Sequence, residues 1–79
     1  MVNKIKLREE IKELNLSGKF LKGNLDLSDF LNLEKLDCLN NKLTSFDLGK
    51  NNQLKSLNLI NNDFSEQDLS FLAHLIKFN

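Results

Sequence analysis

The feature that most constrains this chain is an internal repeat, in which leucines and other apolar residues recur at fixed positions. The phrase LEKLDCLNNKL starts at Leu33, and the closely similar phrase LKSLNLINNDF starts at Leu54. A degenerate copy, IKELNLSGKFL, starts at Ile11 and has Lys19 where the other copies have asparagine. Repeats of roughly 20 to 50 residues are typical of proteins built from similar units that stack on one another.

Each copy contains an apolar–polar–apolar triplet, which predicts a short β-strand with one apolar side. Leu36 and Cys38 share that side in the second copy, as Leu57 and Leu59 do in the third. One such strand cannot bury its own apolar side, so the copies are expected to stack into a parallel sheet with strands about 4.8 Å apart. Cys38 is therefore expected to be a small buried hydrophobic residue and not a nucleophile.

The full spacing L-x-x-L-x-L-x-x-N-x-L resembles the leucine-rich repeat family, and the resemblance runs from about Ile11 to the end of the chain. The copies look similar to the short repeats of expanded fungal and bacterial leucine-rich repeat proteins. The resemblance implies an α/β solenoid, a short right-handed coil with a parallel sheet of three to four short strands and convex extended or turn-like segments. The residue patterns at the two ends add a helical cap at the N-terminus and a helix near the C-terminus to this expectation.

The length of 79 residues fits one domain. Its expected parts are an N-terminal cap over 1–10, repeats over 11–32, 33–53 and 54–74, and the start of a fourth repeat over 75–79. Leu7, Ile11 and Leu14 recur at helical spacing and predict a short amphipathic helix before the first strand. Acidic residues after a capping serine predict a second helix from about Glu66 to His74.

Two asparagines follow the predicted strands of the second and third copies, Asn41 and Asn62. The chain turns inward at these positions and leaves backbone N–H and C=O groups away from water. A carboxamide offers two donors and an acceptor, so it can satisfy both kinds of group. We therefore expect Asn41 and Asn62 to be structural turn residues.

The residues between the apolar ladder positions are expected on the concave side of the sheet, as a candidate partner-binding face. These residues are Glu13, Asn15, Ser17, Lys35, Asp37, Leu39, Ser56, Asn58 and Ile60. Leu39 and Ile60 are aliphatic where a solvent-facing position is more often polar, which makes them candidate anchors for a protein partner.

The last residues repeat the start of the third copy, because Leu75 and Phe78 follow Leu54 and Leu57 at the distance that separates the second and third copies. This register predicts a fourth strand with Lys77 beside Ser56. The candidate self-association edge consists of Leu75, Lys77 and Phe78. An open strand edge with apolar flanks is a template for pairing with another chain.

Charge and hydropathy exclude several functional classes. Eleven basic residues balance eleven acidic ones, which argues against a nucleic-acid binder and against attachment to anionic lipid. No apolar run approaches the ~20 residues of a membrane span, and no signal peptide is visible, so a cytoplasmic location is the default expectation.

No catalytic or metal-binding motif accompanies the repeats. The single histidine, His74, has no nearby histidine or cysteine with which to share a metal. We therefore expect neither enzyme activity nor a cofactor, metal or small-molecule substrate. The expected function is a non-catalytic protein-interaction module that presents its concave face. The alternative is a structural or capping repeat fragment, natural or engineered, that mainly folds and self-associates through its open C-terminal edge.

Overall fold

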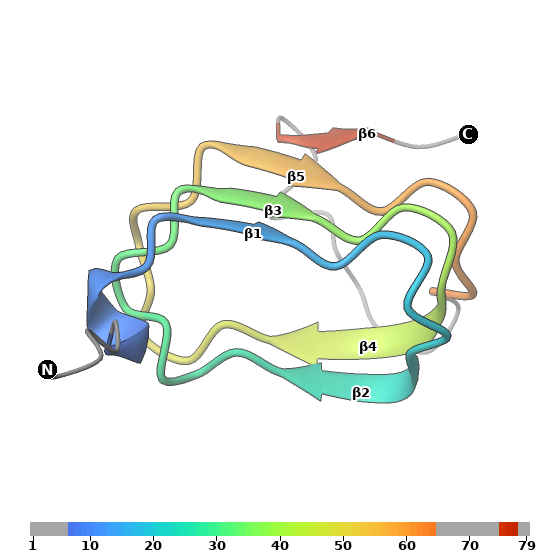
Figure 1. The fold of residues 1–79 in the computed structure, drawn as a ribbon, viewed down its shortest axis with the longest axis horizontal. Helices are drawn as coiled ribbons and strands as arrows, with labels where there is room; N and C mark the ends of the chain where they lie inside the picture. Colours follow the sequence, from blue (N-terminus) through green and yellow to red (C-terminus); the bar gives the residue numbers. More distant parts are fainter. Residues whose placement is uncertain (1–6, 65–74, 78–79) are drawn as a thin grey trace, which may run out of the picture.

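The computed structural model describes residues 7–64 and 75–77, which form two parallel sheets that face each other (Figure 1). The elements are the 3-10 helix η1 (Arg8–Glu10) and the strands β1 (Glu13–Asn15), β2 (Lys22–Asp26), β3 (Lys35–Asp37), β4 (Lys42–Asp47), β5 (Ser56–Asn58) and β6 (Ile76–Lys77). One sheet has the order β1-β3-β5-β6, and the other pairs β2 with β4. From β1 to β5 the chain passes alternately through the two sheets, so β2, β3 and β4 each connect neighbouring strands of the opposite sheet.

The copies pair in the same register along the four-stranded sheet. Leu14 lies opposite Leu36, and Leu36 lies opposite Leu57. Parallel neighbours need a long crossover connection, and the crossover here is the passage through the opposite sheet. The nearly equal spacing of consecutive copies therefore places like residues side by side.

The hydrophobic core fills the space between the two sheets and takes side chains from both. Its buried members are Leu27, Leu33, Leu36, Cys38, Leu43, Phe46, Leu57 and Leu59. The ring of Phe46 meets that of Phe64 edge to face, with centroids 5.8 Å apart, an arrangement that aromatic pairs favour. Both sheets thus contribute one apolar side to a shared interior.

Each of the first five strands ends in an asparagine or aspartate that turns the chain out of the sheet. The Oδ1 atom of this residue accepts a hydrogen bond from the backbone N–H of the second residue after it, at 2.7–3.0 Å. The five residues are Asn15, Asp26, Asp37, Asp47 and Asn58. Such Asx turns give the backbone a local alternative to continued strand pairing. Because these residues recur at nearly equal spacing, twice in each copy, the repeat consists of two similar halves.

The predicted α/β solenoid with helical caps is wrong. The described residues contain one short 3-10 helix and two separate sheets of short strands, and they do not form a closed coil. Ile11 is extended (φ −79°, ψ 127°) and Leu14 lies in β1, so the helix predicted through these residues does not form. An isolated helix of less than about 12 residues is marginal, and the basic residues at its start would oppose the helix dipole. The predicted helix from Glu66 to His74 falls outside the described residues.

The segments expected to be convex and extended or turn-like form the second sheet. Leu25 in β2 lies opposite Phe46 in β4, and both side chains pack in the core or against it. The prediction missed this sheet because it used the whole repeat as its period. The half-repeat places an apolar–Asn/Asp–apolar triplet in these segments as well, which indicates a strand of the same kind.

Candidate functional site

Two rows of polar side chains cross β1, β3 and β5 on the side of the four-stranded sheet that faces away from the core. The first row is Glu13, Lys35 and Ser56, and the second is Asn15, Asp37 and Asn58. Both rows line one shallow hollow. Alternation along each strand produces this face, because Leu36 and Leu57 between the rows are buried. We call these six residues the outer-face rows.

The charges on the outer-face rows are exposed and loosely paired. The Lys35 Nζ and Glu13 Oε1 atoms lie 3.6 Å apart, and both side chains are about two-thirds exposed. An ion pair with this exposure contributes at most about 1 kcal/mol, so a partner can replace it at little cost. Glu34, beside the first row, lies within ion-pair distance of Lys12 and Lys55.

The second row also closes the turns that follow the strands, a structural role that was not predicted from the sequence. One side-chain oxygen each of Asn15, Asp37 and Asn58 closes an Asx turn. The Nδ2 groups of Asn15 and Asn58 have no hydrogen-bond partner among the described residues. These two amides can therefore donate to a partner while their oxygens hold the turn.

The three other residues of the predicted partner-binding face lie apart from this hollow, in the turns that follow the strands: Ser17, Leu39 and Ile60. All three residues are half-buried. The backbone there is tied across copies, since Gly18 N–H donates to Leu39 O at 2.8 Å and Asn40 N–H donates to Ile60 O at 3.1 Å. Leu39 and Ile60 therefore present less apolar surface than their sequence positions indicated.

Asn41 is buried at the turn and hydrogen-bonds through both halves of its amide. Its Oδ1 accepts from the backbone N–H groups of Lys19 and Leu21, at 3.1 and 3.0 Å. Its Nδ2 donates to the carbonyl oxygens of Leu16 and Cys38, at 2.9 and 3.0 Å. The side chain thus joins the first copy to the second.

Asn62 makes the corresponding bonds one copy later. It accepts from Leu43 N–H at 3.0 Å and donates to Cys38 O at 2.8 Å. A third asparagine, Asn51, was not predicted, although its Nδ2 donates to the carbonyl oxygens of Phe30 and Leu33. Asn51 lies midway between Asn41 and Asn62 in the sequence, so the half-repeat is the signal that would have revealed it.

The C-terminal edge differs from its predicted register. Ile76 lies opposite Leu57 and Lys77 opposite Asn58, whereas the sequence pattern placed Lys77 beside Ser56. The partner of Lys77 is therefore two residues further along β5 than predicted. A shift of two residues keeps each side chain on the same side of the sheet, so the apolar pattern of the sequence fits both pairings. Leu75 is half-buried against the core, and Phe78 lies outside the described residues.

The described part of the chain also contains titratable side chains outside the outer-face rows. It holds no group of three histidine, cysteine or acidic side chains that could bind a metal. Burial, and secondarily the charge of Asp37, raises the pKa of the Cys38 thiol to about 12, so this thiol stays protonated and unreactive near neutral pH. Hydrogen bonds from the hydroxyl and backbone N–H of Ser28 lower the pKa of Asp26, which accords with its turn role.

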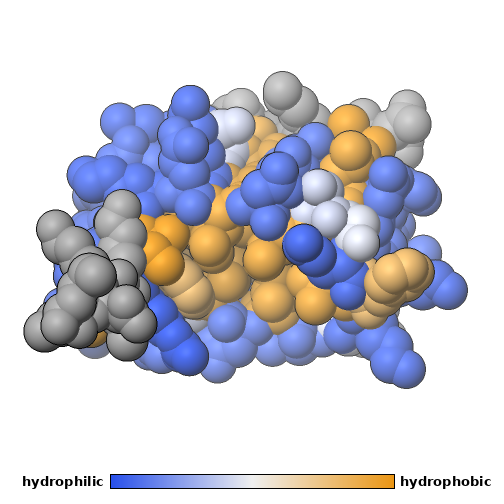
Figure 2. All heavy atoms as spheres, in the orientation of Figure 1, coloured by the Kyte–Doolittle hydropathy of each residue, from blue (hydrophilic) through white to orange (hydrophobic). Residues whose placement is uncertain are grey.

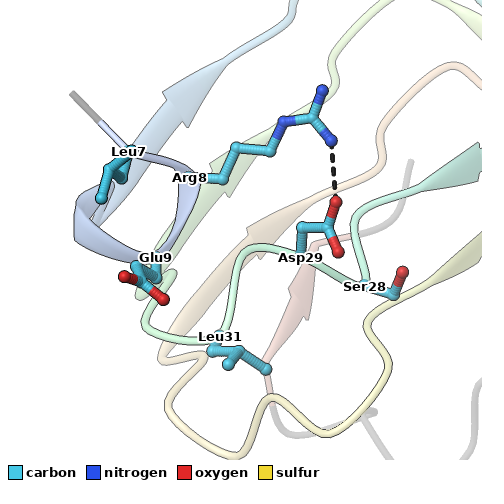
Figure 3. Close-up of a pocket in the computed structure, with 6 residues that line it drawn as sticks. All are labelled: Leu7, Arg8, Glu9, Ser28, Asp29 and Leu31. Atoms are coloured by element: carbon cyan, nitrogen blue, oxygen red, sulfur yellow. Dashed lines mark hydrogen bonds and ion pairs between the residues drawn. The ribbon is translucent and has the colours of Figure 1, made fainter. Parts of the chain in front are cut away.

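A second hollow lies beside η1 and is lined by Leu7, Arg8, Glu9, Ser28, Asp29 and Leu31 (Figure 3). The Arg8 guanidinium crosses it to Asp29 at 2.8 Å, and both side chains are largely exposed. The Arg8 guanidinium also lies 5.9 Å from the ring centre of Phe30. These contacts fix η1 on the loop after β2, which is a structural role.

Comparison with known proteins adds no family to these observations. No family model, no curated protein and no solved structure matches this chain. The resemblance to leucine-rich repeat proteins thus stays a prediction. Within residues 7–64 and 75–77, no helix has the length and apolar character needed to cross a membrane.

Proposed function

We propose that this chain is a non-catalytic protein-interaction module that binds a protein partner on the outer-face rows. The observation that carries the proposal is the hollow in which polar side chains from three parallel strands stand in register. Regular rows of ammonium, carboxylate, hydroxyl and amide groups suit an extended polypeptide, which offers donors and acceptors at similar intervals. The Nδ2 groups of Asn15 and Asn58, which have no partner within the described part of the chain, and the weak Lys35–Glu13 pair can bind a partner without loss of the fold.

Affinity capture followed by mass spectrometry tests this proposal with three immobilised proteins. They are the wild-type chain, a Lys35→Glu variant and a Lys50→Glu variant. Lys50 is an exposed lysine beyond the end of β4, away from the outer-face rows, so its reversal is a matched charge control. We expect wild type and Lys50→Glu to retain the same protein, and Lys35→Glu to lose it.

A protein retained equally by all three baits would contradict binding at the outer-face rows. For a protein that passes this test, amide chemical-shift changes on titration locate the site. The proposal requires the largest changes at residues 13–15, 35–37 and 56–58. Changes confined to the β2–β4 sheet would overturn it.

A further inference from the structure

The β2–β4 sheet carries like charges side by side. Its parallel register places Lys22 opposite Lys42 at one end and Asp26 opposite Asp47 at the other. Like charges directly opposite each other on neighbouring strands are destabilising. Neither lysine has an ion-pair partner within the described residues. Parallel stacking of similar copies produces these rows, and a further parallel copy with the same charges would lengthen them.

Among the described residues, the end of the molecule edged by β1 and β2 exposes apolar side chains. Figure 2 shows an orange band across this face, between hydrophilic rows above and below it. Leu14 and Leu25 on the edge strands are half-buried, whereas Leu36 and Phe46, which lie opposite them one copy later, are buried. The difference arises because an inner copy has a neighbour on each side and the first copy has one.

We propose that a second copy of this chain covers this end, related to the first by a two-fold axis, with β2 paired antiparallel to the second copy's β2. With Asn24 at the centre of the pairing, Lys22 lies opposite the second copy's Asp26, and Asp26 lies opposite the second copy's Lys22. The symmetric contact therefore supplies two opposite-charge pairs and relieves both like-charge rows.

The same rotation reverses the direction of β1 in the second copy. β1 and β2 run in opposite directions along the same face in Figure 1, so a two-fold axis that reverses one strand also reverses the other. The contact then extends the β2–β4 sheet, and the apolar band of each copy faces that of the other. Charge complementarity favours a second copy as the occupant, because β2 is complementary to its own antiparallel image (Lys-Gly-Asn-Leu-Asp).

Charge reversal tests the pairing directly. The Lys22→Asp variant carries two acids on β2, and the Asp26→Lys variant carries two bases, so each is expected to repel its own copy. Mixed together, the two variants restore both opposite-charge pairs. The control is Asp47→Lys, which removes the same kind of Asx turn and reverses the same charge, but on β4, which does not edge this end. Circular dichroism checks that each variant is folded.

Sedimentation equilibrium from micromolar to millimolar protein is the measurement. We expect dimers of wild type and of Asp47→Lys, a dissociation constant at least about tenfold weaker for Lys22→Asp or Asp26→Lys alone, and a dimer from their equimolar mixture. Salt should weaken the wild-type dimer. A wild-type monomer at millimolar concentration would overturn the proposal. A dimer that forms equally in both single variants would also overturn it, because pairing through the C-terminal edge would give that result. A mixture of the two variants that stays monomeric would overturn it as well.

Discussion

Replacing Asn41 with leucine keeps the side-chain volume and removes every hydrogen bond of the amide. Three backbone groups then lose their recorded partner: the N–H groups of Lys19 and Leu21 and the carbonyl of Leu16. The Cys38 carbonyl does not, because it also accepts from Asn62. At about 1 kcal/mol for each part-buried group, the free energy of unfolding should fall by about 3 kcal/mol. A chain of this length is stable by roughly 4–12 kcal/mol, so the loss is large.

Asn62 offers a graded comparison. Replacing it with leucine leaves the Leu43 N–H and the Leu59 carbonyl without their partner, while the carbonyls of Cys38 and Ile60 keep other donors. Two orphaned groups correspond to a loss of about 2 kcal/mol. The expected order of destabilisation is therefore Asn41→Leu, then Asn62→Leu, then an exposed control.

Urea unfolding monitored by circular dichroism measures these differences, with Lys50→Ala as the exposed control. The dependence of the unfolding free energy on urea should have the same slope in all variants, since the area exposed on unfolding is unchanged. If Asn41→Leu unfolds within about 0.5 kcal/mol of Lys50→Ala, the hydrogen-bond reasoning is refuted. An Asn62→Leu variant less stable than Asn41→Leu would refute the group-by-group estimate.

The other predictions concern the stability of variants at two glycines and the reactivity and titration of the cysteine. Gly49 has φ +57°, and an added Cβ would lie 2.9 Å from the Ser28 Cβ, whereas Gly18 has φ +60° and open space. Gly18→Ala should therefore cost about 1 kcal/mol and Gly49→Ala at least about 1 kcal/mol more, and equal urea midpoints would contradict the steric argument. The Cys38 thiol should react with a disulfide reagent only after unfolding, and rapid reaction of the native protein would show that it is accessible. Folding raises the pKa of the Cys38 thiol from 9.0 to about 12, so the unfolded state loses this proton first as the pH rises. The free energy of unfolding should therefore fall more steeply between pH 9 and pH 12 in wild type than in Cys38→Ala. Equal slopes in the two proteins would contradict the raised pKa.

Apolar periodicity predicted the strands around Leu14, Leu36 and Leu57, because alternation of side chains is a local property of the backbone. It failed around Ile11 and Leu14, where helical spacing over a short segment also fits an extended chain whose apolar residues contact a core. Whether such a segment is helical or extended depends on its tertiary contacts, which the spacing of apolar residues does not reveal.

The sequence predicted which residues of the candidate site lie side by side, but it did not predict their hydrogen bonds or their burial. Register follows from equal spacing, so the neighbours Glu13 and Lys35 could be named. The partial burial of Leu39 could not be predicted, because it depends on how the chain leaves the strand, and the Asx turn of Asp37 was missed. The half-repeat of Asn/Asp residues was present in the sequence and would have predicted these turns.

The most direct test of the two-sheet account is a set of nuclear Overhauser contacts between backbone protons in solution. The structure predicts parallel-strand contacts between residues adjoining the pair Leu36 and Leu57 in one sheet, and the pair Leu25 and Phe46 in the other. We expect both sets of contacts to be observed. We also expect strong sequential contacts between Hα and the following N–H over residues 22–26 and 42–47, as is typical of extended chain. Absence of the Leu25–Phe46 set, or helical contacts over those segments, would contradict the second sheet and with it the half-repeat.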